Sequence, residues 1–155
     1  MNKQALFESI LPEFNAIIYG SENRDQKLQA ISQLLSDTFD HYDWVGFYLV
    51  DEKVEQELIL GPFVGDATDH IRIKFGEGIC GQAAKTLETF VVQDVTKEEN
   101  YLACSLSVQS EIVVPIMAEG KFVGELDIDS HLLGAMDQVD KLELEKMCKH
   151  IAKLF

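Results

Sequence analysis

Positive charge is scarce in this chain. Its 155 residues include 13 Lys and Arg against 27 Asp and Glu, which gives a formal net charge of −14. Such a balance repels phosphate backbones and anionic lipid surfaces, so nucleic acid is not expected as a partner. The apolar runs of eighteen or more residues that a membrane helix needs are also missing, and the N-terminal residues do not resemble an export signal. We therefore expect a cytoplasmic protein with no membrane partner.

Cysteine is sparse as well. Cys80, Cys104 and Cys148 form an odd set with wide spacings, which fits neither the disulfide framework of a secreted protein nor a CxxC metal site. None of the four histidines stands at ligand spacing from these cysteines, so no metal site is expected. The sequence instead predicts free thiols in a reducing compartment.

Hydrophobic periodicity predicts an α+β fold. Apolar residues recur at helical spacing near both ends of the chain, and the segments between them alternate as strands do. The predicted helices cover 7–18, 28–39 and 144–154, a short helix follows the glycines of GEGICG, and the predicted strands cover 44–50, 58–65, 70–75, 89–95, 111–117 and 121–129. Residues 96–109 lack a period and are expected to form a loop, which at this length is often functional. With no linker or repeat visible, residues 1–155 are expected to form one domain, with the N- and C-terminal helices on one face of an antiparallel sheet and a pocket on the other.

Acidic and aromatic residues are predicted to share the face of the sheet that is turned away from the helices. Side chains alternate along a strand, so Trp44 and Tyr48 lie on one face, and Asp127 and Asp129 do so on a later strand, with Glu111 starting the strand next to it. Neighbouring carboxylates raise one another's affinity for protons, so one could donate a proton while others hold an ammonium group. The alternatives are a solvated strand face and aromatic side chains that only pack.

The three thiols differ in their surroundings. Cys148 falls on the apolar stripe of the last predicted helix and is expected to be a small buried side chain. Cys104 lies in the long loop, and Cys80 lies at a predicted helix start, where backbone amides can lower the pKa of a thiol. These two are the redox candidates, although a purely structural role is an equal alternative and their spacing does not say whether the sulfurs meet.

Several motifs together resemble a known family, the free methionine-(R)-sulfoxide reductases, which are GAF-type domains acting on the free amino acid. The matching segments appear in the family's order between Trp44 and Ser130; they are WVGFYL, LILGPFVG, HIRIKFGEGICG, YLACS, SEIVVP and LDIDS. The resemblance implies a single GAF-like domain and a thiol-dependent reduction of free methionine (R)-sulfoxide. It implies no metal or organic cofactor.

The resemblance also implies roles for individual residues. Cys104 matches the catalytic cysteine, which attacks the sulfoxide sulfur and becomes a sulfenic acid, and Cys80 would resolve it as a disulfide. A thioredoxin-type dithiol would then reduce the disulfide. The substrate would be bound by five residues, namely Trp44, Tyr48, Glu111, Asp127 and Asp129.

Three positions depart from the family's pattern. His70 stands where most members have a further cysteine, which leaves Cys80 as the internal partner of Cys104. Ser105 replaces a usual aspartate, and Tyr101 stands where a histidine is common. These changes bear on loop geometry and rate. His70 is interpreted as a surface substitution, and the alternative is that it takes part in the site.

Two other classes of function fit the same chain. A non-catalytic GAF sensor would bind an amino-acid-like ligand, although no output domain is visible in these residues. A structural protein would leave the acids and loop thiols without a purpose. The sequence leaves the oligomeric state open, a homodimer included.

Overall fold

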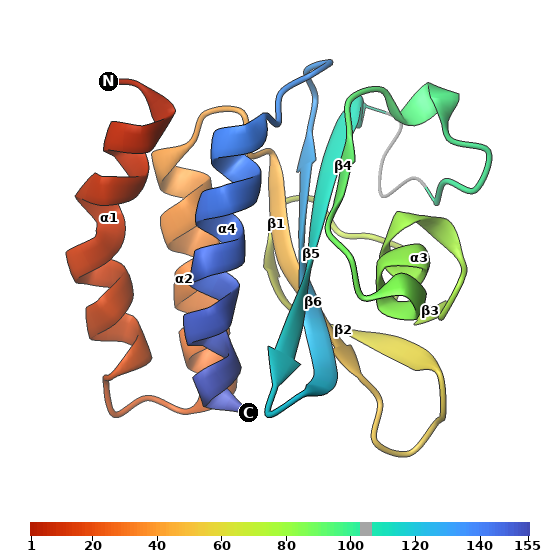
Figure 1. The fold of residues 1–155 in the computed structure, drawn as a ribbon, viewed down its shortest axis with the longest axis horizontal. Coiled ribbons are helices and arrows are strands. Elements are labelled where there is room, and N and C mark those ends of the chain that lie inside the picture. Colours follow the sequence, from red (N-terminus) through yellow and green to blue (C-terminus); the bar gives the residue numbers. More distant parts are fainter. Residues whose placement is uncertain (103–106) are drawn as a thin grey trace.

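A six-stranded antiparallel sheet forms the centre of the computed structural model, which describes residues 1–102 and 107–155 (Figure 1). The strands are ordered β3-β2-β1-β6-β5-β4. The elements in chain order are α1 (Lys3–Ile18), α2 (Arg24–Thr38), β1 (Trp44–Val50), β2 (Glu57–Val64), β3 (Arg72–Lys74), α3 (Gly78–Thr86), β4 (Phe90–Val92), the 3-10 turn η1 (Val95–Lys97), β5 (Ser110–Ala118), β6 (Lys121–Ser130), α4 (Gln138–Ile151) and the 3-10 turn η2 (Ala152–Leu154). The α+β prediction is confirmed.

Helices α2 and α4 cover one face of the sheet and α1 packs on both of them from outside, while α3 lies on the other face (Figure 1). The alternate residues Val45 and Phe47 of β1 and Leu126 and Ile128 of β6 are fully buried in the core that the sheet forms with these helices. The terminal helices therefore pack on one face, as predicted. The short helix α3 packs on the opposite face and, with residues of β1 to β5, forms a second buried cluster that contains Trp44, Tyr48 and Cys80.

Two predicted strands are shorter in the structure. The strand predicted over 89–95 stops at Val92, because the side chain of Asp94 accepts hydrogen bonds from the main chain and hydroxyl of Thr96 and starts η1. The strand predicted over 70–75 begins at Arg72, because the main chain of His70 bonds to side chains instead: its N–H donates to Thr68 Oγ1 and its carbonyl accepts from Tyr48 Oη.

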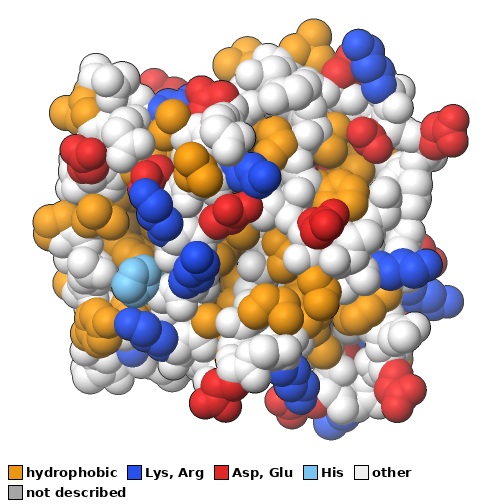
Figure 2. All heavy atoms as spheres, viewed as in Figure 1, with side chains coloured by type: hydrophobic (Ala, Val, Ile, Leu, Met, Phe, Trp, Pro, Cys, Tyr) orange, Lys and Arg blue, Asp and Glu red, His pale blue; other side chains and the backbone are white. Residues whose placement is uncertain are grey.

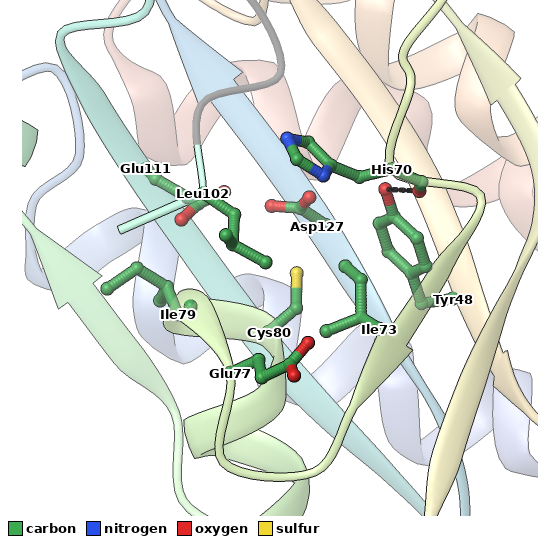
Figure 3. A pocket seen from close by; sticks show the side chains of 10 residues that line it. Tyr48, His70, Ile73, Glu77, Ile79, Cys80, Leu102, Glu111 and Asp127 are labelled. Atoms are coloured by element: carbon green, nitrogen blue, oxygen red, sulfur yellow. Dashed lines mark hydrogen bonds between the residues drawn. The ribbon is translucent and has the colours of Figure 1, made fainter. Parts of the chain in front are cut away.

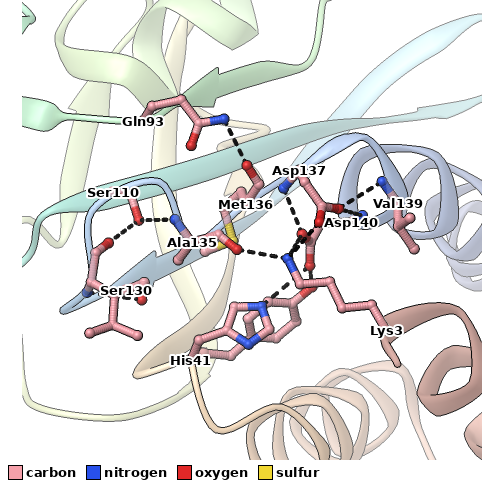
Figure 4. Close-up of polar contacts among 12 residues, drawn as sticks. Lys3, His41, Gln93, Ser110, Ser130, Ala135, Met136, Asp137, Val139 and Asp140 are labelled. Carbon is pink, nitrogen blue, oxygen red and sulfur yellow. Dashed lines mark hydrogen bonds and ion pairs between the residues drawn. The ribbon is translucent and has the colours of Figure 1, made fainter. Parts of the chain in front are cut away.

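A buried acid joins three elements on the helical side of the sheet (Figure 4). Asp140, in the first turn of α4, accepts hydrogen bonds from Tyr42 Oη at 2.6 Å, from Lys3 Nζ and from the main-chain N–H of Asp137 at 2.7 Å. Burial alone would raise the pKa of this carboxyl, but the hydrogen bonds from His41, Lys3, Tyr42 and Asp137 lower it below its usual range. The network fixes the start of α4 against α1 and the entry to β1.

Acidic and basic side chains are interspersed on the surface. On the side seen in Figure 2, acidic side chains are scattered among basic and hydrophobic ones. Among the helices of the described residues, none has the length and apolar character to span a membrane.

Candidate active site

Strand register places the acidic and aromatic side chains next to one another. Strand β1 pairs with β6 so that Trp44 lies opposite Asp129 and Tyr48 lies opposite Glu125. Strand β5 pairs with the other edge of β6, and Glu111 lies opposite Asp129. Because side chains at paired positions point to the same face of a sheet, the alternation in the sequence becomes one wall of carboxyls and rings beneath α3.

A small cavity lies between this wall and α3 (Figure 3). The residues around it are Tyr48, His70, Ile73, Glu77, Gly78, Ile79, Cys80, Leu102, Glu111 and Asp127. Its volume of about 10 Å³ is enough for about one water molecule and far less than an amino acid needs. A substrate can therefore enter only if lining side chains move, and Leu102, packed where a Cβ on Gly78 would meet it at 2.9 Å, covers the cavity.

The carboxyls in this wall resist ionisation. Burial first, and then the negative charges of Asp127 and Asp129, raise the pKa of Glu111 well above its usual value. Burial, and then the charge of Asp129, raise the pKa of Asp127. Burial, and then the charge of Asp127, raise the pKa of Glu125. Low dielectric and like charge both penalise the ionised form. The protonated form of these carboxyls is therefore favoured relative to that of an exposed acid.

Asp127 is one of the acids that face the cavity. It is fully buried, and no described residue donates a hydrogen bond of regular geometry to either of its oxygens. Weak hydrogen bonding from Glu111 and from the Cys80 thiol opposes the rise in its pKa without cancelling it. An unsatisfied buried carboxyl costs stability, so this group is positioned to interact with something that enters the cavity.

The two aromatic residues of β1 fix a neighbouring loop. Trp44 Nε1 donates a hydrogen bond of 3.0 Å to the carbonyl of Asp66, and Tyr48 Oη donates one of 2.8 Å to the carbonyl of His70. The Trp44 ring stacks on Phe63 and, less closely, on Tyr48, with centroids 5.4 and 6.3 Å apart. Tyr48 lines the cavity, whereas Trp44 is not among the lining residues and contacts the cavity wall through the Tyr48 ring.

Cys80 lies in the first turn of α3, at the position predicted from the glycines. Gly78 has a φ of +61°, which a side chain would strain, and a Cβ on Gly81 would meet the carbonyl of Lys74 at 2.5 Å. Asn100 ties this turn to the following loop, because its Oδ1 accepts from Gly78 N–H at 2.8 Å. The Cys80 thiol is thereby held at the floor of the cavity (Figure 3).

The other two cysteines lie elsewhere. Cys104 falls within 103–106, outside the described residues. Cys148 is buried in the core between α4 and the sheet, where burial, followed by the charge of Glu145, raises the pKa of its thiol. Its position agrees with the role of a small buried side chain.

Sequence reasoning did not anticipate all of the cavity. His70, for which a surface substitution was the first interpretation, is partly buried and lines the cavity, which favours the alternative of a place in the site. The feature of the sequence that could have indicated a place in the cavity is that His70 stands where most members of the family have a cysteine. Leu102 and Ile79 gave no signal, because apolar residues are expected in any core.

Three of the residues around the cavity could hold a cation. One ligand atom each from Cys80, Glu111 and Asp127 lie within 4.8 Å of one another. A thiolate with two carboxylates is a donor set for a thiophilic divalent ion. The spacing of cysteine and histidine along the chain could not reveal this set, because the two acids come from strands far away in sequence.

This combination of sheet, helices and cavity defines a GAF domain, and the GAF domain family model matches residues 23–154. The chain is 37% identical to GAF domain-containing protein A of Dictyostelium discoideum, over 96% of this chain and 91% of that protein. It is 39% identical to the free methionine-R-sulfoxide reductase of Saccharomyces cerevisiae, over 99% of this chain and 87% of the relative.

A solved structure agrees with these matches. The free methionine-R-sulfoxide reductase from Neisseria meningitidis in complex with its substrate superposes with a TM-score of 0.94 and 38% identity, covering 100% of this chain and 91% of the other. The chain belongs to the family of free methionine-R-sulfoxide reductases. The resemblance drawn from its motifs is thereby confirmed.

Proposed function

We propose that this protein reduces free methionine (R)-sulfoxide to methionine, with Cys104 as the attacking thiol. Family membership supports the reaction. The observation that carries the proposal is the set of buried carboxyls, Glu111 and Asp127, in contact with the same cavity as the Cys80 thiol. Reduction of a sulfoxide needs a thiol and a proton donor at the oxygen, and buried carboxyls whose pKa is raised suit the second role.

The first step transfers oxygen from substrate sulfur to enzyme sulfur. Cys104 attacks the sulfoxide sulfur, a protonated carboxyl of the wall gives its proton to the sulfoxide oxygen, and methionine leaves while Cys104 becomes a sulfenic acid. The thiol proton replaces the one that the carboxyl gave up. In sum, one thiol and one sulfoxide become one sulfenic acid and one thioether, so the sulfoxide sulfur gains the two electrons that Cys104 loses. Asp129, Trp44 and Tyr48 complete the site that holds the substrate.

The second step restores the enzyme. The Cys80 thiol attacks the sulfenic acid of Cys104, a disulfide forms and water leaves. A thioredoxin-type dithiol then reduces this disulfide, which suits a protein in the reducing cytoplasm. In this proposal residues 1–155 act as one domain.

Substitution of Cys104 tests the attacking role. With NADPH, thioredoxin reductase and thioredoxin as the coupled reductant, the Cys104→Ser variant is expected to lose all turnover of free methionine (R)-sulfoxide. Cys148→Ser is the matched control, because its thiol lies on the far side of the sheet, and it should keep its activity. Persistent NADPH consumption by Cys104→Ser would contradict the assignment, and saturable binding by the wild-type protein without conversion would indicate a sensor.

Substitution of Cys80 tests the resolving role separately. Cys80→Ser is expected to release one equivalent of methionine in a single turnover, to form no intramolecular disulfide and to recycle slowly with thioredoxin. Mass spectrometry of the protein after one turnover would show a sulfenic acid or its trapped adduct. Unchanged recycling would remove Cys80 from the mechanism.

A further inference from the structure

His70 brings a nitrogen-containing ring into a cavity that is otherwise acidic and apolar. Figure 3 shows its imidazole reaching over the cavity toward Asp127, with Cys80 below. Glu111 and Glu77 are the other acids around the cavity. Among the described lining residues, His70 has the one side chain that can carry a positive charge.

The main chain holds this ring in place. The His70 carbonyl accepts from Tyr48 Oη at 2.8 Å, and its N–H donates to Thr68 Oγ1 at 3.1 Å. The next residue, Ile71, is tied to β2, because its carbonyl accepts from Leu60 N–H at 2.8 Å. These hydrogen bonds fix the main chain from which the imidazole projects, so less conformational freedom remains to be lost when the ring binds a ligand.

A free amino acid carries two charged groups, and each needs a partner when it is buried in this cavity. Its ammonium group is matched by the carboxyls of the wall, but its α-carboxylate needs a donor, because a buried and unpaired carboxylate is costly. When ionised, the carboxyls of the wall have no proton to donate to the α-carboxylate, and their negative charge would repel it. An imidazole donates one N–H when neutral, and a charge-assisted hydrogen bond when protonated.

We propose that His70 binds the α-carboxylate of the substrate and thereby sets the preference for the free amino acid. This inference rests on the proposed function. A methionine sulfoxide residue within a peptide has a neutral amide where the free amino acid has its carboxylate, so His70 gains no charged partner from it. The same holds for methionine sulfoxide carboxamide, which differs from the free substrate only at that end and serves as the probe.

The test compares both substrates in the wild-type protein and in His70→Asn. For the free acid, His70→Asn is expected to raise KM and lower kcat/KM about 10-fold or more, which corresponds to the loss of a hydrogen bond to a charged group. For the carboxamide, kcat/KM should stay within about 2-fold of the wild-type value, because no charged contact is lost. His150→Asn, on α4 at the opposite face of the sheet, is the matched control and should change neither value.

Two results would overturn the assignment. One is an equal loss on both substrates, which would mean that His70 only supports the cavity; the other is no loss on the free acid. Thermal unfolding of His70→Asn and of a second variant, His70→Gln, shows whether either effect comes from misfolding. If the wild-type protein converts neither substrate, the proposed function fails rather than the role of His70.

Discussion

Replacing Asp127 with asparagine is expected to stabilise the fold while it removes most of the activity. Asp127 is fully buried, and burial and the charge of Asp129 raise the pKa of its carboxyl. Asparagine has nearly the same shape, carries no charge, and can donate hydrogen bonds to the neighbouring carboxylates. The substitution therefore removes a buried ionisable group that opposes folding. In the proposed mechanism it also removes a proton donor or a substrate contact, so activity should fall.

The stability gain of Asp127→Asn should grow with pH. A carboxyl whose pKa is higher in the folded chain contributes stability below its unfolded pKa, and that contribution is lost as pH rises toward the folded pKa, at about 1.4 kcal/mol per pH unit for each proton. An unsatisfied buried polar group costs about 1–3 kcal/mol. For a chain of this length, that is a rise in Tm of roughly 2–10 °C at about pH 8, and little change at about pH 4, near the unfolded pKa.

Circular dichroism melts across this pH range, with the thioredoxin-coupled assay alongside, measure both effects. A lower Tm for Asp127→Asn than for the wild-type protein at the alkaline end would refute the reasoning, because it would mean that the carboxylate makes a net stabilising contact. Full activity would exclude Asp127 from the chemistry.

Asp140→Asn is the matched control, since it is the same substitution at an acid that is equally buried but has partners. Hydrogen bonds from Lys3 and Tyr42 outweigh burial and lower the pKa of Asp140, so its contribution is present above the unfolded pKa and is lost as pH falls. Lys3 is partly exposed, so its charge stays hydrated and we expect a loss of about 2–3 kcal/mol at neutral pH. Activity per folded molecule should be unchanged.

Three further substitutions have defined outcomes. Gly46→Ala places a Cβ 2.5 Å from the Trp44 ring and 2.6 Å from Phe63, so overpacking should cost about 1–3 kcal/mol and raise KM by moving the aromatic wall, as melts and kinetics would show. Tyr48→Phe loses a hydrogen bond to the main chain and should lower stability by about 1 kcal/mol and weaken substrate binding. Cys148→Ser buries a hydroxyl in the apolar core and should cost about 1–3 kcal/mol with activity retained.

The sequence could predict which side chains share a face, because the period of a strand is two and does not depend on distant contacts. Glu111, Asp127 and Asp129 were expected on one face for this reason, and Cys80 at a helix start because glycines precede it. Register could not be predicted in the same way. That Trp44 faces Asp129 depends on the pairing of β1 with β6, which are separated by most of the chain.

The shape of the cavity was also beyond local reasoning. Its walls come from the strands, from α3, and from the loops around His70 and Leu102, so its size depends on how distant segments pack. Whether the sulfurs of Cys80 and Cys104 meet could not be deduced from their spacing, and Cys104 lies outside the described residues. For His70 a surface substitution was the first interpretation because a lone histidine has no pattern, and its position became clear only from the hydrogen bonds of its main chain.

In the proposed mechanism, the central position of the acids in the sheet explains how simple carboxyls would serve as proton donors. Asp127 and Asp129 lie on β6, flanked by β1 and β5 and away from both edges of the sheet. Their strand buries Leu126 and Ile128 on the other face against the helices, so the apolar core holds β6 in place despite the unfavourable charges. On an edge strand the same acids would be hydrated and ionised. The chemistry at the cavity therefore depends on a core that no substrate touches, and substitutions on the helical face that loosen β6 should lower the pKa of the acids and, with it, the supply of protons.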